Sequence, residues 1–198
     1  MSSFTSATSI STTTTEDLDY QPNSFRNYSK IDHEKYFLIQ AISSTLENII
    51  SRNLTIENAE VIIQQQSNSP FSSDVIPAIT LNEYLLRICT FTQIENEILI
   101  TAFIFVDRIS SLGNIMLNEY NVHRILFTSV LLAIKYNEDI HFTMEYYAGI
   151  AGIDVKNLFT LEYEFTKVVN YCFYISDDEF ENHKNYLLEN GIYYNCEQ

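Results

Sequence analysis

The most constraining feature of this chain is an uncharged segment near its middle, residues 125–134, with the sequence ILFTSVLLAI. A helix that is apolar on nearly every side belongs in the middle of a helical bundle, because every face of it must be covered. Lys135 follows directly, and a lysine at the C-terminal end of a helix is favoured by the helix dipole. The segment therefore predicts a central helix whose last turn carries a positive charge to the surface.

The rest of the chain predicts further helices with short connections. Its 198 residues include only four glycines and three prolines, which favours one all-α domain over a turn-rich β architecture. Asp32 and Thr80 are expected N-caps, and Glu83 completes a capping box with Thr80. The expected helices span residues 33–52, 81–91, 95–111, 119–136, 144–150, 155–170 and 178–189. The five between residues 81 and 170 form the expected bundle, with one helix flanking it on each side.

The charge of the chain excludes several classes of partner. The net charge is −15, which opposes binding to nucleic acid or to an anionic membrane surface. Residues 138–198 contain twelve acidic residues and three lysines, so they carry −9 of that charge. This acidity fits a basic protein partner and equally a solvated acidic face. No apolar run approaches the roughly 18–20 residues that a membrane span requires.

The sequence offers no arrangement of residues typical of an enzyme. The four histidines are scattered, and neither they nor the three cysteines have the spacing of a zinc site. The widely separated cysteines fit a reducing compartment. There is no glycine-rich phosphate loop. We therefore expect no catalytic residue, no metal and no cofactor.

Six segments resemble those of cyclins in their order and separation. They are FSS…PAITL…YLLRI within residues 71–88, FVDRI at 105–109, VHRIL at 122–126, AIKYNED at 133–139, YAGIAGI at 147–153 and LEYEF at 161–165. More narrowly, they are similar to P/U-type cyclins, which carry a single cyclin box. The resemblance implies an all-α fold, a five-helix cyclin box with flanking N- and C-terminal helices.

The resemblance also divides the chain. A Ser/Thr-rich disordered tail is expected over residues 1–30, followed by an N-terminal helix and linker over 31–70. The cyclin box is expected over 71–175, and a C-terminal helix and tail over 176–198. The implied function is that of a regulatory subunit, which binds and activates a cyclin-dependent kinase as a heterodimer in the nucleus and cytoplasm. A cyclin-fold scaffold, which binds a non-kinase partner or a kinase that it does not activate, remains the alternative.

The resemblance assigns a kinase-binding role to Lys135 and Glu162. They match the lysine and glutamate with which cyclins hold the kinase, in a groove between the third and fifth box helices that packs against a PSTAIRE-type helix. Leu132, Leu158 and Phe159 are expected to add apolar contacts there. Lys135 and Glu162 could also pair with each other inside the bundle, and the two roles are compatible.

A second charged pair, Arg87 and Asp107, is implied to be a buried structural salt bridge between the first two box helices. Asp107 is expected to share a helix face with Phe103 and Ile104, where an unpaired carboxylate would be unfavourable. We therefore expect this pair to brace the box rather than to take part in binding.

Overall fold

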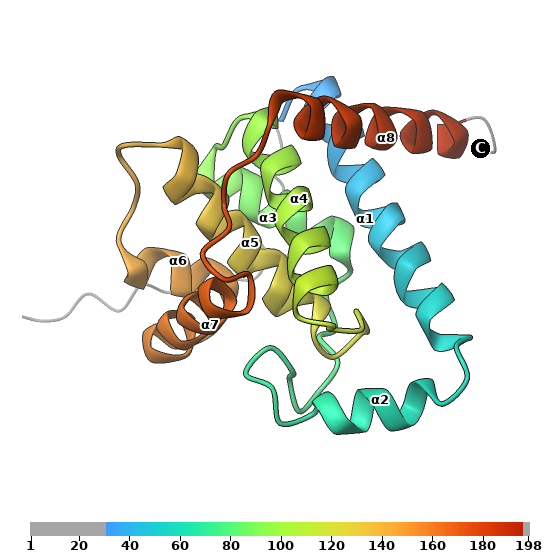
Figure 1. Ribbon diagram of the computed structural model, residues 1–198. Coiled ribbons are helices and arrows are strands. Elements are labelled where there is room, and N and C mark those ends of the chain that lie inside the picture. Colours follow the sequence, from blue (N-terminus) through green and yellow to red (C-terminus); the bar gives the residue numbers. More distant parts are fainter. Residues whose placement is uncertain (1–30, 196–198) are drawn as a thin grey trace, which may run out of the picture.

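The computed structural model describes the chain from Ile31 to Asn195, and the side chains up to Glu189. Every regular element in this part is a helix, which confirms the all-α prediction (Figure 1). The helices are α1 (His33–Leu54), α2 (Ala59–Gln66), α3 (Leu81–Thr92), α4 (Asn96–Leu112), α5 (Val122–Asn137), α6 (Met144–Ala151), α7 (Val155–Val168) and α8 (Asp177–Asn195). The expected disordered tail, residues 1–30, lies outside the described residues.

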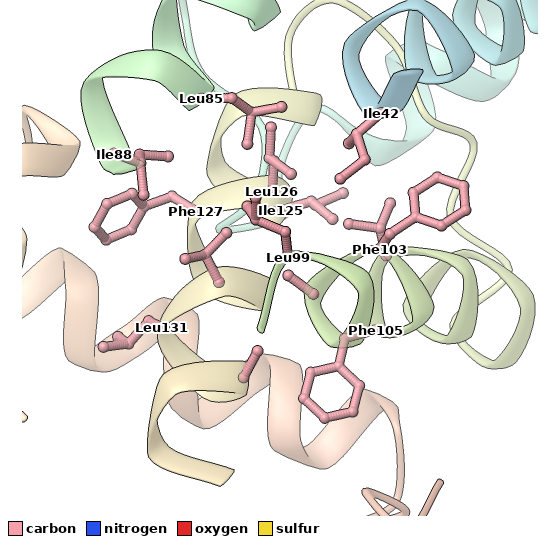
Figure 2. Packing of buried hydrophobic residues seen from close by; sticks show 14 of the residues in the cluster. Ile42, Leu85, Ile88, Leu99, Phe103, Phe105, Ile125, Leu126, Phe127 and Leu131 are labelled. Carbon is pink, nitrogen blue, oxygen red and sulfur yellow. The ribbon is translucent and has the colours of Figure 1, made fainter. Parts of the chain in front are cut away.

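The helix α5 lies at the centre of the bundle, as its uncharged sequence predicts. All its residues from Ile125 to Ile134 are buried. The helix α4 packs along it, and α6 and α7 cover its other sides. Figure 2 shows side chains of α1, α3, α4 and α5 meeting in one hydrophobic cluster; those labelled are Ile42, Leu85, Ile88, Leu99, Phe103, Phe105, Ile125, Leu126, Phe127 and Leu131.

The predicted caps define the starts of two helices. The Asp32 side chain accepts a hydrogen bond from the Lys35 amide at 2.8 Å, and α1 begins at the next residue after Asp32. Thr80 and Glu83 form the expected capping box at the start of α3. Because each cap satisfies an amide that the helix itself leaves without a partner, it fixes where the helix begins.

Three helices depart most from the prediction. The helix α2 occupies part of the expected linker and begins after Asn58, which has a left-handed backbone with φ of 65°. The helix α5 begins at Val122 rather than 119, because the side chain of Asn121 accepts from the Asn118 amide and holds these residues in a turn. The helix α8 continues through Gly191, a residue that weakens a helix by only about 1 kcal/mol.

The C-terminal helix α8 closes the fold. It runs across the N-terminal part of α1 and also packs on α4, so it joins the two ends of the described chain (Figure 1). Of the helices in the described part, none combines the length and the apolar character needed to cross a membrane.

Candidate functional site

The structure brings Lys135 and Glu162 into contact. Lys135 lies in the last turn of α5, and its Nζ donates a hydrogen bond to Oε1 of Glu162 on α7. The two side chains are 27% and 19% exposed, so the pair lies at the edge of the bundle rather than inside it. The ion pair therefore joins two helices and remains accessible from solvent.

The neighbourhood of the pair explains why the two side chains meet. The side chain of Asn137 donates to the carbonyl of Ala133 at 2.7 Å and stabilises the last turn of α5. On α7, Asp154 caps the helix by accepting from the Asn157 amide at 2.8 Å. Glu162 lies two turns further along, and α7 packs directly on α5. The end of α5 therefore fixes the position of Lys135, and the start of α7 fixes that of Glu162.

The expected apolar contacts are only partly accessible. Leu158 is completely buried and Leu132 is 8% exposed, whereas Phe159 is 52% exposed. The expectation that Leu158 contacts a partner is wrong, because it belongs with Leu161 and Phe165 to the stripe of α7 that faces the core. Phe159 follows Leu158 in the sequence and points away from that stripe.

A shallow hollow surrounds Phe159 on the outer face of α7. Its lining residues are Val155, Lys156, Phe159, Thr160 and Tyr163. Tyr163 is 59% exposed and was not predicted as a contact residue. The signal was present in the sequence, because Phe159 and Tyr163 are four residues apart and therefore share a face that the core stripe does not use. The hollow offers aromatic surface near the ion pair.

The connection between α5 and α6 exposes further apolar side chains that sequence reasoning missed. Ile140 is 88% exposed and Phe142 is 49% exposed. The ring of Phe142 lies against that of Tyr146, with 4.4 Å between their centroids. No helical periodicity reaches these loop residues, so their exposure could not be derived from a pattern.

The described residues provide no metal-binding arrangement. They contain no group of three or more His, Cys, Asp or Glu side chains placed to hold a metal ion. Burial raises the pKa of the Cys89 thiol to about 12, so this cysteine stays protonated and unreactive at neutral pH. Burial lowers the pKa of His123, although its bond to the Ile79 carbonyl acts in the opposite direction.

Comparison with known proteins decides the family. A model of the Cyclin family matches residues 36–173, which covers more than half of the chain and includes both Lys135 and Glu162. The chain belongs to the cyclin family. Cyclins are regulatory proteins rather than enzymes, and this cyclin is accordingly a regulatory protein.

The relatives of this cyclin place it among the P/U-type members. It is 32% identical to Cyclin-U4-1 of Arabidopsis thaliana over 152 residues, which are 76% of this chain and 74% of that protein. It is 31% identical to Cyclin-P4-1 of Oryza sativa subsp. japonica over 130 residues, 65% of this chain and 61% of that protein. A third relative is the PHO85 cyclin-like protein psl1 of Schizosaccharomyces pombe, with 29% identity over 131 residues, 63% of this chain and 54% of that protein.

In this cyclin, the expected buried pair of Arg87 and Asp107 is not formed. The Asp107 side chain is 64% exposed and lies 3.9 Å from His183 of α8. Arg87 instead donates to the carbonyl of Gly149 at 3.1 Å, at the end of α6. Asp107 does share a face with Phe103, as expected, but that face meets the rings of α8 and leaves the carboxylate at its edge.

The neighbouring Arg108 has the structural role that the sequence analysis gave to this charged pair. Its side chain is 11% exposed, and its Nη2 lies 2.5 Å from Oε1 of Glu179 on α8. Its Nη1 donates to the carbonyl of Cys172 at 2.8 Å. The bracing arginine of α4 therefore connects to the C-terminal segment and not to α3.

Proposed function

We propose that this cyclin binds and activates a cyclin-dependent kinase, and that the kinase docks where Lys135 and Glu162 meet. The observation that carries the proposal is the ion pair itself, which joins the end of α5 to α7 at a partly exposed edge. An ion pair between helices needs no surface access for a purely structural role. Its accessibility, together with the exposed aromatic side chains beside it, favours a protein partner.

The proposed mechanism involves no chemistry by the cyclin. The kinase helix of the PSTAIRE type carries a glutamate that must pair with the lysine holding the ATP phosphates. A cyclin that binds the inward position of this helix more tightly than the outward one shifts the kinase toward its active state. Lys135 and Glu162 would hold the helix through polar contacts, and Phe159 would add apolar contact. The complex is a heterodimer of one cyclin and one kinase.

Affinity purification from native cells, followed by mass spectrometry and a kinase assay, tests the partner. We expect a stoichiometric protein kinase whose activity rises when purified cyclin is added. A kinase that binds without activation would contradict the activating step. A stable complex that contains no kinase would refute the proposal and indicate a scaffold.

Exchange of the two charges separates kinase binding from internal pairing. Lys135→Glu and Glu162→Lys each place like charges beside each other, and each should lose kinase binding. The double variant restores an ion pair of reversed polarity, so its thermal stability should recover. If kinase binding depends on which of the two positions carries the positive charge, the double variant still fails to bind. Recovery of both binding and stability in the double variant would show that the pair acts only inside the cyclin.

The chain provides a matched control on the same helix. Glu164 and Lys167 form an exposed ion pair within α7, with 3.2 Å between Lys167 Nζ and Glu164 Oε1. Exchange of these two charges also alters the surface of α7 but leaves the contact with α5 unchanged. The Glu164→Lys, Lys167→Glu double variant should bind the kinase like the wild type.

A further inference from the structure

A second cavity, lined by residues of α3, α5 and α7, has basic side chains in its wall, although the chain is acidic. It has a volume of about 230 Å³. Among the described residues that line it are Arg87, His123 and Arg124, and none is aspartate or glutamate. The described part of the cavity wall is therefore basic, although the chain has a net charge of −15.

The two arginines come from different helices and are held in place by backbone groups. Arg87 of α3 donates to the carbonyl of Gly149. Arg124 of α5 donates through a single nitrogen, Nη1, to the carbonyls of Pro70 at 2.9 Å and Ser72 at 3.0 Å. Among the described residues, Arg124 forms no ion pair. Its position is therefore fixed, while its Nε and Nη2 donors remain available.

The positive charges of Arg87 and Arg124 act electrostatically on another side chain of the cavity wall, that of Tyr84. Tyr84 lines the cavity, and burial raises the pKa of its hydroxyl, while the charges of Arg87 and Arg124 act in the opposite direction. His123 also lies in the wall, with its Nε2 3.0 Å from the Ile79 carbonyl. An anion in the cavity would interact favourably with all of these groups.

We propose that this cavity binds a phosphoryl group, either as free phosphate or as the phosphate of a modified side chain. Arginine is the residue best suited to this ligand, because its planar fork donates two parallel hydrogen bonds to phosphate oxygens. The remaining wall includes the apolar Pro77 and Phe127, which would exclude water and strengthen the charge interaction. The proposal does not depend on kinase binding, because Lys135 and Glu162 do not line this cavity.

Thermal unfolding of the full chain, followed by circular dichroism, tests the proposal with two probes. Inorganic phosphate and O-phosphoserine are each titrated against sodium chloride of equal ionic strength. At about one hundred times its dissociation constant, a bound probe should raise the melting temperature by about 5–10 °C. The Arg124→Gln variant should show no rise, even if its starting temperature is lower. Arg52 is exposed on α1, so Arg52→Gln serves as the matched control and should respond like the wild type.

The two probes distinguish the source of the phosphoryl group. Tighter binding of O-phosphoserine would indicate a modified side chain, and equal or tighter binding of phosphate would indicate the free ion. A response to neither probe, or the same response in Arg124→Gln, would overturn the proposal.

If Arg124→Gln does not fold, the wild type still provides a decisive measurement. The pKa of His123, followed by NMR, should rise when phosphate replaces chloride, since a nearby anion stabilises the imidazolium that burial disfavours. Phosphate binding that leaves His123 unchanged would place the anion elsewhere and refute this site.

Discussion

The attachment of α8 through Arg108 leads to a quantitative prediction. Arg108 makes two contacts with the C-terminal segment, a charged hydrogen bond to the Cys172 carbonyl and an ion pair with Glu179. A net hydrogen bond to a charged group contributes about 1.5–3 kcal/mol. Glu179 is 33% exposed, so its ion pair is partly screened by water and adds about 0.5–1 kcal/mol. Arg108→Met should therefore lower the free energy of unfolding by about 2–4 kcal/mol.

The adjacent Asp107 is the matched comparison. Its side chain is 64% exposed and its nearest charged partner, His183, is 3.9 Å away, so Asp107→Asn should cost less than about 0.5 kcal/mol at pH 7.5. Arg108→Lys keeps the charge but not the two-pronged geometry, so it should fall between Arg108→Met and the wild type. The three variants together show how much of the stability depends on the charge of Arg108, on the geometry of its guanidinium group, and on its position rather than that of Asp107.

Urea unfolding followed by circular dichroism at 25 °C measures all three differences. In thermal unfolding, Arg108→Met should lower the melting temperature by about 5–15 °C for a domain of this size. A loss for Asp107→Asn that exceeds the loss for Arg108→Met would refute this reasoning. It would instead support the buried pair of Asp107 and Arg87 that the sequence analysis expected.

Further predictions concern three other features. The Asp107 carboxylate raises the pKa of His183 against the effect of burial, so this contact stabilises the fold below pH 6.5 and loses its effect as the pH rises through the folded-state value. The stability difference between wild type and Asp107→Asn, measured by urea unfolding, should therefore shrink between pH 5.5 and about pH 8. Leu158→Ala should cost about 2–5 kcal/mol of stability, whereas Phe159→Ala should change stability little and weaken kinase binding in a pulldown. Thr80→Ala removes a capping box and should cost about 1 kcal/mol in the same unfolding assay.

The sequence predicted the central helix correctly because its apolar residues follow one another without a charged interruption. Residues 125–134 carry no charge and are mostly apolar, which predicts a helix covered on every side, and all ten are buried. The charged residue that follows, Lys135, then has to lie at the end of that helix. The contact between Lys135 and Glu162 follows from the packing of α7 on α5. An ion pair of this kind fits a structural role and is also compatible with a role in kinase binding.

The sequence was less informative where two neighbours compete for one face. Leu158 and Phe159 are both large and apolar, and the resemblance assigns both to the groove, although the spacing of Leu158, Leu161 and Phe165 already places Leu158 on the core stripe. Asp107 and Arg108 pose the same problem at the end of α4, where the angle of about 100° between successive residues separates an exposed side chain from a buried one. The position of α8 decides between them, and α8 begins 69 residues after Arg108 in the sequence.

The missed helix α2 has a different cause. It has only eight residues, about two turns, and ends in three glutamines, so few apolar positions are available to define a periodic stripe. Its position depends on contacts distant in sequence, because the side chain of Gln66 donates to the Asn114 carbonyl at 3.1 Å and accepts from the Met116 amide at 3.2 Å. Tertiary hydrogen bonds of this kind cannot be inferred from local pattern.

The placement of the proposed kinase site at the end of the most buried helix has a mechanical consequence. Because α4, α6 and α7 surround α5, the position of Lys135 is set by core packing rather than by a mobile loop. Displacement of Lys135 relative to Glu162 would require α5 and α7 to separate and would expose side chains such as Leu158, which is completely buried. A partner that binds here meets a surface held by core packing, so we expect conformational change on binding to occur mainly in the partner. An activating subunit must bind one position of the kinase helix more tightly than the other, and a surface of fixed geometry provides that difference without an ordering cost of its own.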